Sequence, residues 1–338
     1  MSGRRRRSSP AGGGGPRSGG GGEHLLSPLR HGAKSRRATS PGGGGLGRRD
    51  FLIGLSAVGL TGCSARGETT APIFAAPETF DLSALERERG GRLGFVARDT
   101  GSGRTLAWRG DERFVYCSTF KMYLAAATLV RVQSGRERLD RAVPITRADM
   151  VNHAPVTEPA VGSTLTVEQL MKGTVEVSDN PAANLLLNAM GGLGPMQAFY
   201  RSIGDATTRV DRFEPEMNRL DGDKDTIQPL QSANNIQHLF LSDDTPLVPT
   251  SKTMLLQWMF DAPTGPGRIK AGVPEGWRVA HKTGTGGYGP TNDIGVLYPP
   301  SGAPVVLAVY YHATRDAESN EGVIAEATRL ALKAFGHG

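Results

Sequence analysis

Ser118-Thr119-Phe120-Lys121 opens the apolar stretch FKMYLAAATLVRV at residues 120–132, and this stretch decides how the chain folds. It is rich in helix formers and is closed by Gly135, so it predicts a helix. Because the helix is apolar on nearly every side, we expect it at the centre of the core. Ser118 and Thr119 precede it, where a hydroxyl can cap the free N–H groups of a first turn.

Lys121 is the unexpected residue of this helix. It follows Ser118 by one helical turn, so both side chains lie on the same face. A buried ammonium without a partner is costly and tends to lose its proton. A neutral amine beside a hydroxyl at a helix start can act as the base for an activated nucleophile. In an isolated Ser-x-x-Lys, a capping serine and a solvated lysine are the commoner explanation, so the motif needs partners.

The charge of the chain is unevenly distributed. The 338 residues carry a formal charge of +6, with 39 Lys and Arg against 33 Asp and Glu. Residues 1–50 hold eleven of the basic and two of the acidic residues, which leaves 28 basic and 31 acidic residues after them. The body is therefore slightly acidic and lacks the basic footprint of a nucleic-acid-binding protein. It is long enough for one large domain or two closely packed ones.

The first 63 residues are interpreted as a leader and an export signal. Residues 1–47 are rich in Gly, Arg and Ser and predict disorder. Arg48-Arg49 precede the uncharged run FLIGLSAVGLTG, which is too short to span a bilayer but is typical of a twin-arginine signal. The run ends in Leu60-Thr-Gly-Cys63, which resembles a bacterial lipobox, although a chance cysteine is the alternative. We expect residues 48–63 to direct export to the periplasm, with membrane anchoring through a lipidated Cys63.

After a linker at residues 64–79, residues 80–338 predict a catalytic domain in two parts. Its expected elements are a helix at 81–89, strands at 92–98, 104–109, 278–285, 292–298 and 305–311, and a terminal helix at about 319–334. The order predicts an α/β (α+β) fold, in which N- and C-terminal helices flank an antiparallel sheet beside an all-α subdomain. The α/β part comprises about 80–117 and 261–338, and the α part about 118–260.

Two further motifs have ordinary explanations when taken alone. Ser178-Asp-Asn180-Pro181 is a common helix start. Lys282-Thr283-Gly284-Thr285 ends a strand in a glycine-rich turn, where a lysine is often merely solvated. Both threonines point to one face of that strand, and Gly284 lets a ligand approach the backbone. Such an edge could bind a carboxylate and offer an N–H to an oxyanion.

A polar loop at about residues 209–229 carries Arg212-Phe-Glu214-Pro215 and Asn218. Loops of this length inside a compact domain are usually functional or disordered. The Glu214–Pro215 bond is a candidate cis peptide. We also expect an Arg212–Asp225 ion pair to hold the neck of the loop.

The ordered set of motifs resembles the class A serine β-lactamases. Its members are Ser118-x-x-Lys121, Ser178-Asp-Asn180, Glu214-x-x-x-Asn218 and Lys282-Thr-Gly284, and the similarity extends from about residue 80 to 336. The resemblance implies the serine β-lactamase/penicillin-binding fold, with the site between a sheet domain and an α domain. It also implies hydrolysis of the β-lactam amide of penicillin- and cephalosporin-type antibiotics through a serine acyl-enzyme, and hence resistance to them.

The family roles transfer to matching positions here. By resemblance, Ser118 is the nucleophile, and the N–H groups of Ser118 and Thr285 form the oxyanion hole. Glu214 with Asn218 holds the deacylating water, and either Lys121 or Glu214 is the acylation base.

The remaining roles concern proton relay and substrate binding. By resemblance, Ser178 relays a proton to the lactam nitrogen with help from Lys282, and Asn180 binds the side-chain amide. The substrate carboxylate meets the strand end and a nearby arginine, namely Lys282, Thr283, Gly284, Thr285 and Arg268.

No cofactor or metal is expected, because the histidines lack zinc-ligand spacing. We expect a monomer whose partner is a small β-lactam. Two rival interpretations use the same serine and lysines: a D,D-peptidase-like penicillin-binding protein, and a β-lactam sensor that stays acylated. The pair Glu214 and Asn218 argues against both, because it would activate the water that releases the acyl group.

Four departures from the family accompany the resemblance. Cys117 is present, but Gly286 and Gly287 occupy the region of the disulfide partner found in some carbapenem-hydrolysing relatives, so that activity is not implied. His153 stands where many relatives have an aromatic residue. His281 replaces a common Asp, so Lys282 is expected to lack a nearby carboxylate. The loop after Asn218 is slightly short.

Overall fold

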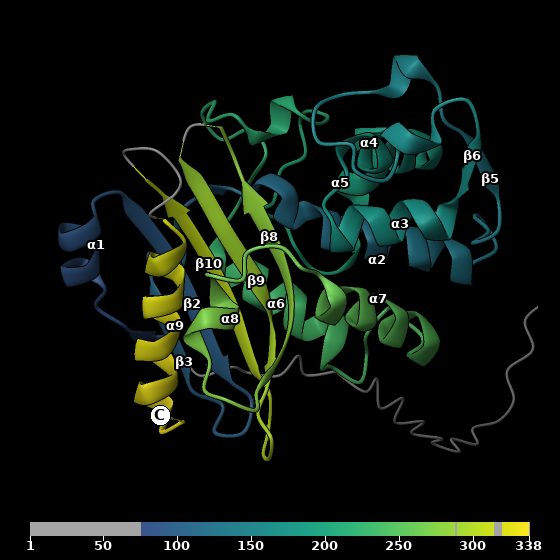
Figure 1. Cartoon of the computed structure of the whole chain (residues 1–338). Coiled ribbons are helices and arrows are strands. Elements are labelled where there is room, and N and C mark those ends of the chain that lie inside the picture. The colour runs from purple at the N-terminus through teal and green to yellow at the C-terminus, as the bar shows by residue number, and fades with distance from the viewer. Residues whose placement is uncertain (1–75, 288, 314–319, 338) are drawn as a thin grey trace, which may run out of the picture. The chain divides into compact units, whose positions relative to one another are not determined.

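The computed structural model describes residues 76–287, 289–313 and 320–337 (Figure 1). The export signal, the lipobox and most of the linker predicted at residues 64–79 lie outside this part. The described residues belong to one compact unit. None of the helices in the described ranges is long and apolar enough to cross a membrane.

A six-stranded sheet forms the α/β part, in the order β1-β3-β2-β10-β9-β8. Its strands are β1 (Glu78–Thr79), β2 (Arg92–Asp99), β3 (Thr105–Trp108), β8 (Arg278–Thr285), β9 (Pro290–Tyr298) and β10 (Val305–His312). All neighbours pair antiparallel except β1, which runs parallel to β3. The predicted antiparallel sheet is therefore correct, and β1 is an added strand within residues assigned to the linker.

Three helices cover one face of the sheet: α1 (Ser83–Arg89), α8 (Ile269–Gly272) and α9 (Glu321–Phe335) (Figure 1). Leu85, Ile269 and Ile324 of these helices share a buried cluster with Phe95 and Leu307 of the sheet. Alternate strand residues point to this face, as the period of two requires. The terminal helix was predicted within two residues at each end.

The other face packs against the α part through α6 (Pro229–Phe240), and α2 (Phe120–Gln133) belongs to the buried cluster formed there. Every residue of α2 from Phe120 to Leu129 is buried, so this helix is central as predicted. The remaining helices of this part are α3 (Val167–Glu176), α4 (Asn180–Met190), α5 (Leu193–Ser202) and α7 (Pro249–Asp261). The small strands are β4 (Phe114–Val115), which pairs with β7 (Thr226–Ile227), and β5 (Ala142–Pro144), which pairs with β6 (Thr164–Thr166).

The predicted capping of α2 by Ser118 or Thr119 is wrong. These residues form a 3₁₀ turn, η1 (Cys117–Thr119), that runs directly into α2. The Phe120 N–H therefore donates to the Cys117 carbonyl, and the Thr119 hydroxyl donates to the Tyr116 carbonyl at 2.8 Å. Since η1 supplies carbonyl acceptors to the first turn, the Ser118 hydroxyl is left available for the cleft.

Close packing of β2 on β4 gives a test of this core. A Cβ atom on Gly94 would lie 2.4 Å from the Phe114 ring. We expect Gly94→Ala to lower the free energy of unfolding by about 1–3 kcal/mol, because overpacking forces neighbours to shift. Thermal unfolding measures the effect. The matched control is Gly194→Ala in α5, where the added methyl meets open space; equal melting temperatures for the two variants would contradict this packing.

Candidate active site

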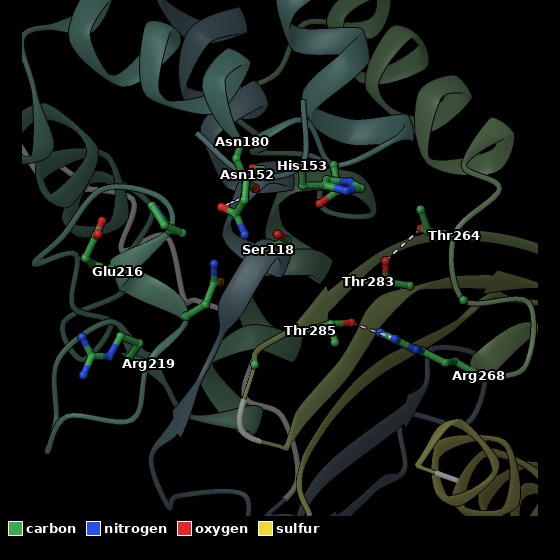
Figure 2. Close-up of a pocket in the computed structure, with 15 residues that line it drawn as sticks. Ser118, Asn152, His153, Asn180, Glu216, Arg219, Thr264, Arg268, Thr283 and Thr285 are labelled. Atoms are coloured by element: carbon green, nitrogen blue, oxygen red, sulfur yellow. Dashed lines mark hydrogen bonds between the residues drawn. The ribbon is translucent and has the colours of Figure 1, made fainter. Parts of the chain in front are cut away.

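A cleft of about 450 Å³ lies between the end of β8 and the α part (Figure 2). Seven of the eleven predicted site residues line it, and Lys121, Glu214, Lys282 and Gly284 are buried next to them. The lining comprises Ser118, Asn152, His153, Ser178, Asn180, Pro215, Glu216, Asn218, Arg219, Thr264, Gly265, Arg268, Thr283, Thr285 and Gly287. The structure thus brings together all four motifs from segments that are far apart in the sequence.

Ser118 lies at the floor of the cleft and is 9 % exposed. The preceding residue, Cys117, has a left-handed φ of 49°, which is a costly conformation for a non-glycine residue and is common at active sites. The Ser118 hydroxyl donates a hydrogen bond to Oε1 of Glu214 at 3.4 Å. The serine hydroxyl therefore contacts an ionisable carboxyl group.

Lys121 is fully buried, as its sequence context predicted. Its Nζ donates to the Ser178 carbonyl at 2.7 Å and to Oδ1 of Asn180, and it forms an ion pair with Oε1 of Glu214 at 3.1 Å. Burial lowers the pKa of the Lys121 amine, and the nearby Glu214 carboxylate opposes this shift. Ser118 and Lys121 thus meet at the same carboxylate oxygen, because Glu214 lies between them.

Glu214 is 2 % exposed and is held at both its backbone and its side chain. Its N–H donates to Oδ1 of Asn184 at 3.0 Å, and the Asn184 amide donates to the Glu214 carbonyl at 2.9 Å. The Asn218 amide donates to Oε2 of Glu214. The Glu214–Pro215 bond is cis, as expected. Asn184 was missed by the sequence analysis, although a polar residue on the apolar face of α4 was a usable signal.

The neck of the loop is fastened by Asp225, which is fully buried. Its carboxylate accepts from the Arg212 Nε at 2.6 Å and from the N–H groups of Asp211 and Arg212. The Tyr116 hydroxyl donates to the same carboxylate at 3.3 Å. The expected Arg212–Asp225 ion pair is therefore present, and Asp225 also joins the loop to the segment just before Ser118.

Ser178 projects from a strained turn with a φ of 62°. Its hydroxyl oxygen lies 3.1 Å from Nζ of Lys282 and 3.4 Å from Nζ of Lys121. Asp179 fixes this turn, because its carboxylate accepts from the N–H groups of Val156 at 2.9 Å and of Ala182 at 2.8 Å. Burial, and then the positive charge of Lys121, lower the pKa of Lys282 well below its usual value.

The end of β8 presents two hydroxyls to the cleft (Figure 2). Thr285 Oγ1 accepts from the Arg268 guanidinium at 2.8 Å, and the Thr283 hydroxyl donates to Thr264 Oγ1 at 2.8 Å. Arg268 also donates to the Gly284 carbonyl at 3.1 Å and forms an ion pair with Glu321 at 3.0 Å. This wall therefore offers hydroxyl and guanidinium donors to an anion.

Gly284 has a different role from the one its sequence position indicated. A Cβ atom there would lie 2.7 Å from the Tyr116 carbonyl and 3.0 Å from Thr119 Cγ2. The absent side chain thus lets β8 approach the turn that carries Ser118. Gly286 makes a similar approach to Cys117, whose sulfur would be 3.2 Å from the added Cβ. Cys117 is a buried free thiol, as expected, because Gly286 stands in the region where some relatives have the disulfide partner.

The structure also places the two histidines that differ from the family pattern. His153 has a left-handed φ of 59°, and its Nε2 lies 2.8 Å from the Val177 carbonyl, next to Ser178. His281 is fully buried, and its Nδ1 lies 2.9 Å from both carboxylate oxygens of Asp293. Asp293 was not singled out in the sequence, because its pairing depends on strand register.

The fold and this constellation define a serine enzyme that transfers an acyl group. A model of the β-lactamase enzyme family matches residues 79–335. The carbapenem-hydrolyzing β-lactamase KPC of Klebsiella oxytoca is 41 % identical over 86 % of this chain and 97 % of its own length. A β-lactamase of Citrobacter koseri is 41 % identical over 74 % of this chain and 85 % of its own.

Two solved structures extend the comparison. An ancestral class A β-lactamase has a TM-score of 0.73 and 49 % identity, over 75 % of this chain and 98 % of its own. The class A β-lactamase from Mycobacterium abscessus has a TM-score of 0.72 and 43 % identity, over 75 % and 98 %. The chain therefore belongs to the β-lactamase enzyme family, as a class A serine β-lactamase that hydrolyses β-lactam amides.

The neck of the loop provides a test of the site geometry. We expect Asp225→Ala to lower the free energy of unfolding by about 1–3 kcal/mol, because it leaves buried N–H donors without an acceptor. The turnover number should fall as well, by up to about a hundredfold if Glu214 is displaced by about 1 Å. Thermal unfolding and steady-state kinetics measure both effects. Asp223→Ala is the control, since Asp223 lies in the same loop with an exposed side chain; matching behaviour of both variants would refute the anchoring role.

Proposed function

We propose that the cleft hydrolyses penicillin- and cephalosporin-type β-lactams through an acyl-enzyme on Ser118, and so confers resistance to them. The observation that carries this proposal is the contact of Ser118 Oγ and Lys121 Nζ with one oxygen of Glu214, at 3.4 and 3.1 Å. A nucleophile, a cation and a carboxylate within hydrogen-bonding reach are the parts needed to remove the serine proton.

Glu214 is the acylation base in this proposal. Lys121 Nζ has four acceptors, Ser178 O, Asn180 Oδ1, Glu214 Oε1 and, at 3.4 Å, Ser178 Oγ, so each of the three protons of an ammonium has an acceptor. An amine that donates all three protons cannot accept another one. The oxygen within reach of the Ser118 proton is then Oε1 of Glu214, and Lys121 stabilises the carboxylate and orients it.

After the carbonyl is attacked, the N–H groups of Ser118 and Thr285 stabilise the oxyanion. Each such donor typically contributes a factor of about a hundred or more to the rate. Ser178 then delivers a proton to the lactam nitrogen. Its hydroxyl lies between the two buried ammonium groups of Lys121 and Lys282, so a proton that leaves it can be replaced from either side.

Substrate recognition uses the wall formed by β8. The substrate carboxylate binds to Thr283, Thr285 and Arg268, with Lys282 behind them and Gly284 at the strand edge. The acyl side chain meets the Asn180 amide on the opposite wall. Each hydroxyl and guanidinium of this wall already has a neighbour in the wall, which holds it in place for the ligand.

Deacylation separates this function from its two rivals. Glu214 and Asn218 hold the hydrolytic water, so the acyl group is released rather than kept. A D,D-peptidase-like penicillin-binding protein and a β-lactam sensor would both remain acylated by a penicillin.

The glutamate variant tests this assignment. We expect Glu214→Ala to lower cephalosporin turnover by at least about a hundredfold, and any acyl-enzyme that it forms to persist on Ser118. Mass spectrometry of the intact protein detects the acyl group, and a chromogenic cephalosporin reports turnover. Ser118→Ala should show neither acylation nor turnover, and Asp223→Ala, which removes an exposed carboxylate of the same loop outside the cleft, should retain turnover. A stoichiometric burst without turnover in the unmutated enzyme would instead identify a sensor or a peptidase.

We also propose that the enzyme acts as a monomer in the periplasm after twin-arginine export, tethered to the membrane through a lipidated Cys63. The support is the pattern Arg48-Arg49, the uncharged run and Leu60-Thr-Gly-Cys63.

Fractionation of cells that express the full chain tests the export proposal. We expect the double substitution Arg48→Lys with Arg49→Lys to retain the enzyme in the cytoplasm. Cys63→Ser should abolish palmitate labelling and move the activity from the membrane to the soluble periplasmic fraction. Palmitate labelling that persists in Cys63→Ser would refute lipidation at Cys63. Normal export of the variant with both arginines replaced by lysine would refute the twin-arginine route.

A further inference from the structure

His281 and Asp293 form a fully buried pair on the face of the sheet opposite to Ser118. The ring Nδ1 lies 2.9 Å from both oxygens of the Asp293 carboxylate, and the Ile269 N–H donates to one of them at 3.2 Å. Nε2 of His281 has no hydrogen-bond partner within the described ranges. No step of the proposed mechanism uses this pair, although His281 is the neighbour of Lys282 in β8.

Lys282 is a fully buried amine whose direct contacts are both neutral. Its Nζ donates to the Thr283 carbonyl at 2.9 Å and to Ser178 Oγ at 3.1 Å. Among the described residues, no carboxylate lies within 4.0 Å of it, in contrast to Lys121 with its Glu214 partner. The expected lack of a directly paired carboxylate is therefore correct. A buried ammonium in this position needs a negative charge at longer range to remain charged.

The strand register brings such a charge close. Thr283 of β8 faces Asp293 of β9, so Asp293 lies diagonally next to Lys282, one strand away. Lys282 points to Ser178 of the α part and Asp293 to Ile269 of α8, and both side chains are fully buried. Because both side chains are buried, the attraction between the two charges is weakly screened. Asp293 also acts on the pKa of Lys282 in the direction that favours the ammonium.

The other charges near the pair do not replace Asp293. Lys270 of α8 is a cation, and Arg268, which precedes α8, is ion-paired with Glu321 of α9 at 3.0 Å. Glu214, on the opposite side of Lys282, is already paired with Lys121. Asp293 is thus the carboxylate near Lys282 whose direct partner is a histidine rather than a lysine or an arginine, with Lys270 as a second cation within range of its charge.

We propose that Asp293, held in place by His281, is the buried counter-charge that keeps the Lys282 ammonium charged for binding the substrate carboxylate. His281 holds the Asp293 carboxylate through its Nδ1, which lies 2.9 Å from both carboxylate oxygens. Both residues are positioning residues, since they act through Lys282 and do not contact the substrate. The proposal rests on the carboxylate-binding role given to Lys282 above.

The alkaline limb of kcat/KM for benzylpenicillin tests the proposal, because this substrate has one carboxylate that stays ionised. Lys282 binds it as an ammonium, so kcat/KM falls as the pH rises through the pKa of Lys282. Loss of the negative charge in Asp293→Asn lowers that pKa further. We expect the limb to move by about one pH unit toward lower pH, with the change in KM rather than in kcat. Background hydrolysis is subtracted with Ser118→Ala.

Two histidine variants give an independent route to the same measurement. His281→Asn keeps an N–H donor for Asp293 and should leave the limb in place. His281→Leu removes the ring nitrogen that holds the Asp293 carboxylate in place beside Lys282, so the limb should move in the same direction as in Asp293→Asn. Thermal unfolding identifies any variant that is not folded at the assay temperature. A limb that stays in place in folded Asp293→Asn, or that moves equally in His281→Asn and His281→Leu, would overturn the proposal.

Lys282→Arg separates this inference from the proposed function. A guanidinium does not titrate in this range, so the alkaline limb should disappear in Lys282→Arg and in its double variant with Asp293→Asn. If the limb persists in Lys282→Arg, it does not belong to Lys282, and the carboxylate-binding role itself is wrong. If it disappears there but Asp293→Asn leaves the limb of the unmutated lysine in place, only the counter-charge is wrong.

Discussion

The ion pair between Lys121 and Glu214 is the interaction on which the rest of the site depends. Both side chains are fully removed from water, and such a pair is tolerated only when its remaining donors and acceptors are bonded. Those bonds come from three separate elements: the turn at Ser178, the start of α4 at Asn180, and the loop residue Asn218. The α part therefore has to place all three around α2, or it leaves a charge uncompensated. This requirement explains why a polar loop is fixed so firmly by Asp225.

Backbone strain is concentrated around the same pair. Four of the five left-handed residues other than glycine in the described ranges are Cys117, His153, Ser178 and Asp225. Cys117 precedes Ser118, Ser178 contacts Lys121, and the His153 carbonyl accepts from the N–H of Asn180, which also contacts Lys121. Asp225 holds the neck of the loop that carries Glu214. A stable core of apolar side chains surrounds them, which offsets the cost of conformations that would not persist in an isolated loop. The site thus depends on the fold for its local geometry as well as for its charges.

Many of the helices, strands and site residues could be predicted from the sequence, because short stretches of neighbouring residues specify them. The end of β8 follows from the glycine-rich turn after Thr285, and α2 follows from its composition. The bounds of α2 were predicted within one residue, but its capping was not, because η1 provides the first carbonyls and makes a side-chain cap unnecessary. The His281–Asp293 contact depends on the register of β8 against β9, which neither strand specifies alone. A close approach to the Gly284 backbone was predicted correctly. The group that approaches is the Tyr116 carbonyl rather than a ligand, and only the folded chain identifies it.

The order of strands in the sheet has a consequence for how the chain matures during synthesis. β10, the last strand to be made, lies between β2 from the beginning of the domain and β9 from its end. Until β10 emerges, β2 and β9 each expose an unpaired edge, which is a template for association with other chains. The wall of the cleft formed by β8 is held to the rest of the sheet only through β9 and β10. A ribosome that stops short of residue 305 therefore releases a chain whose nucleophile is present but whose binding wall is not yet attached.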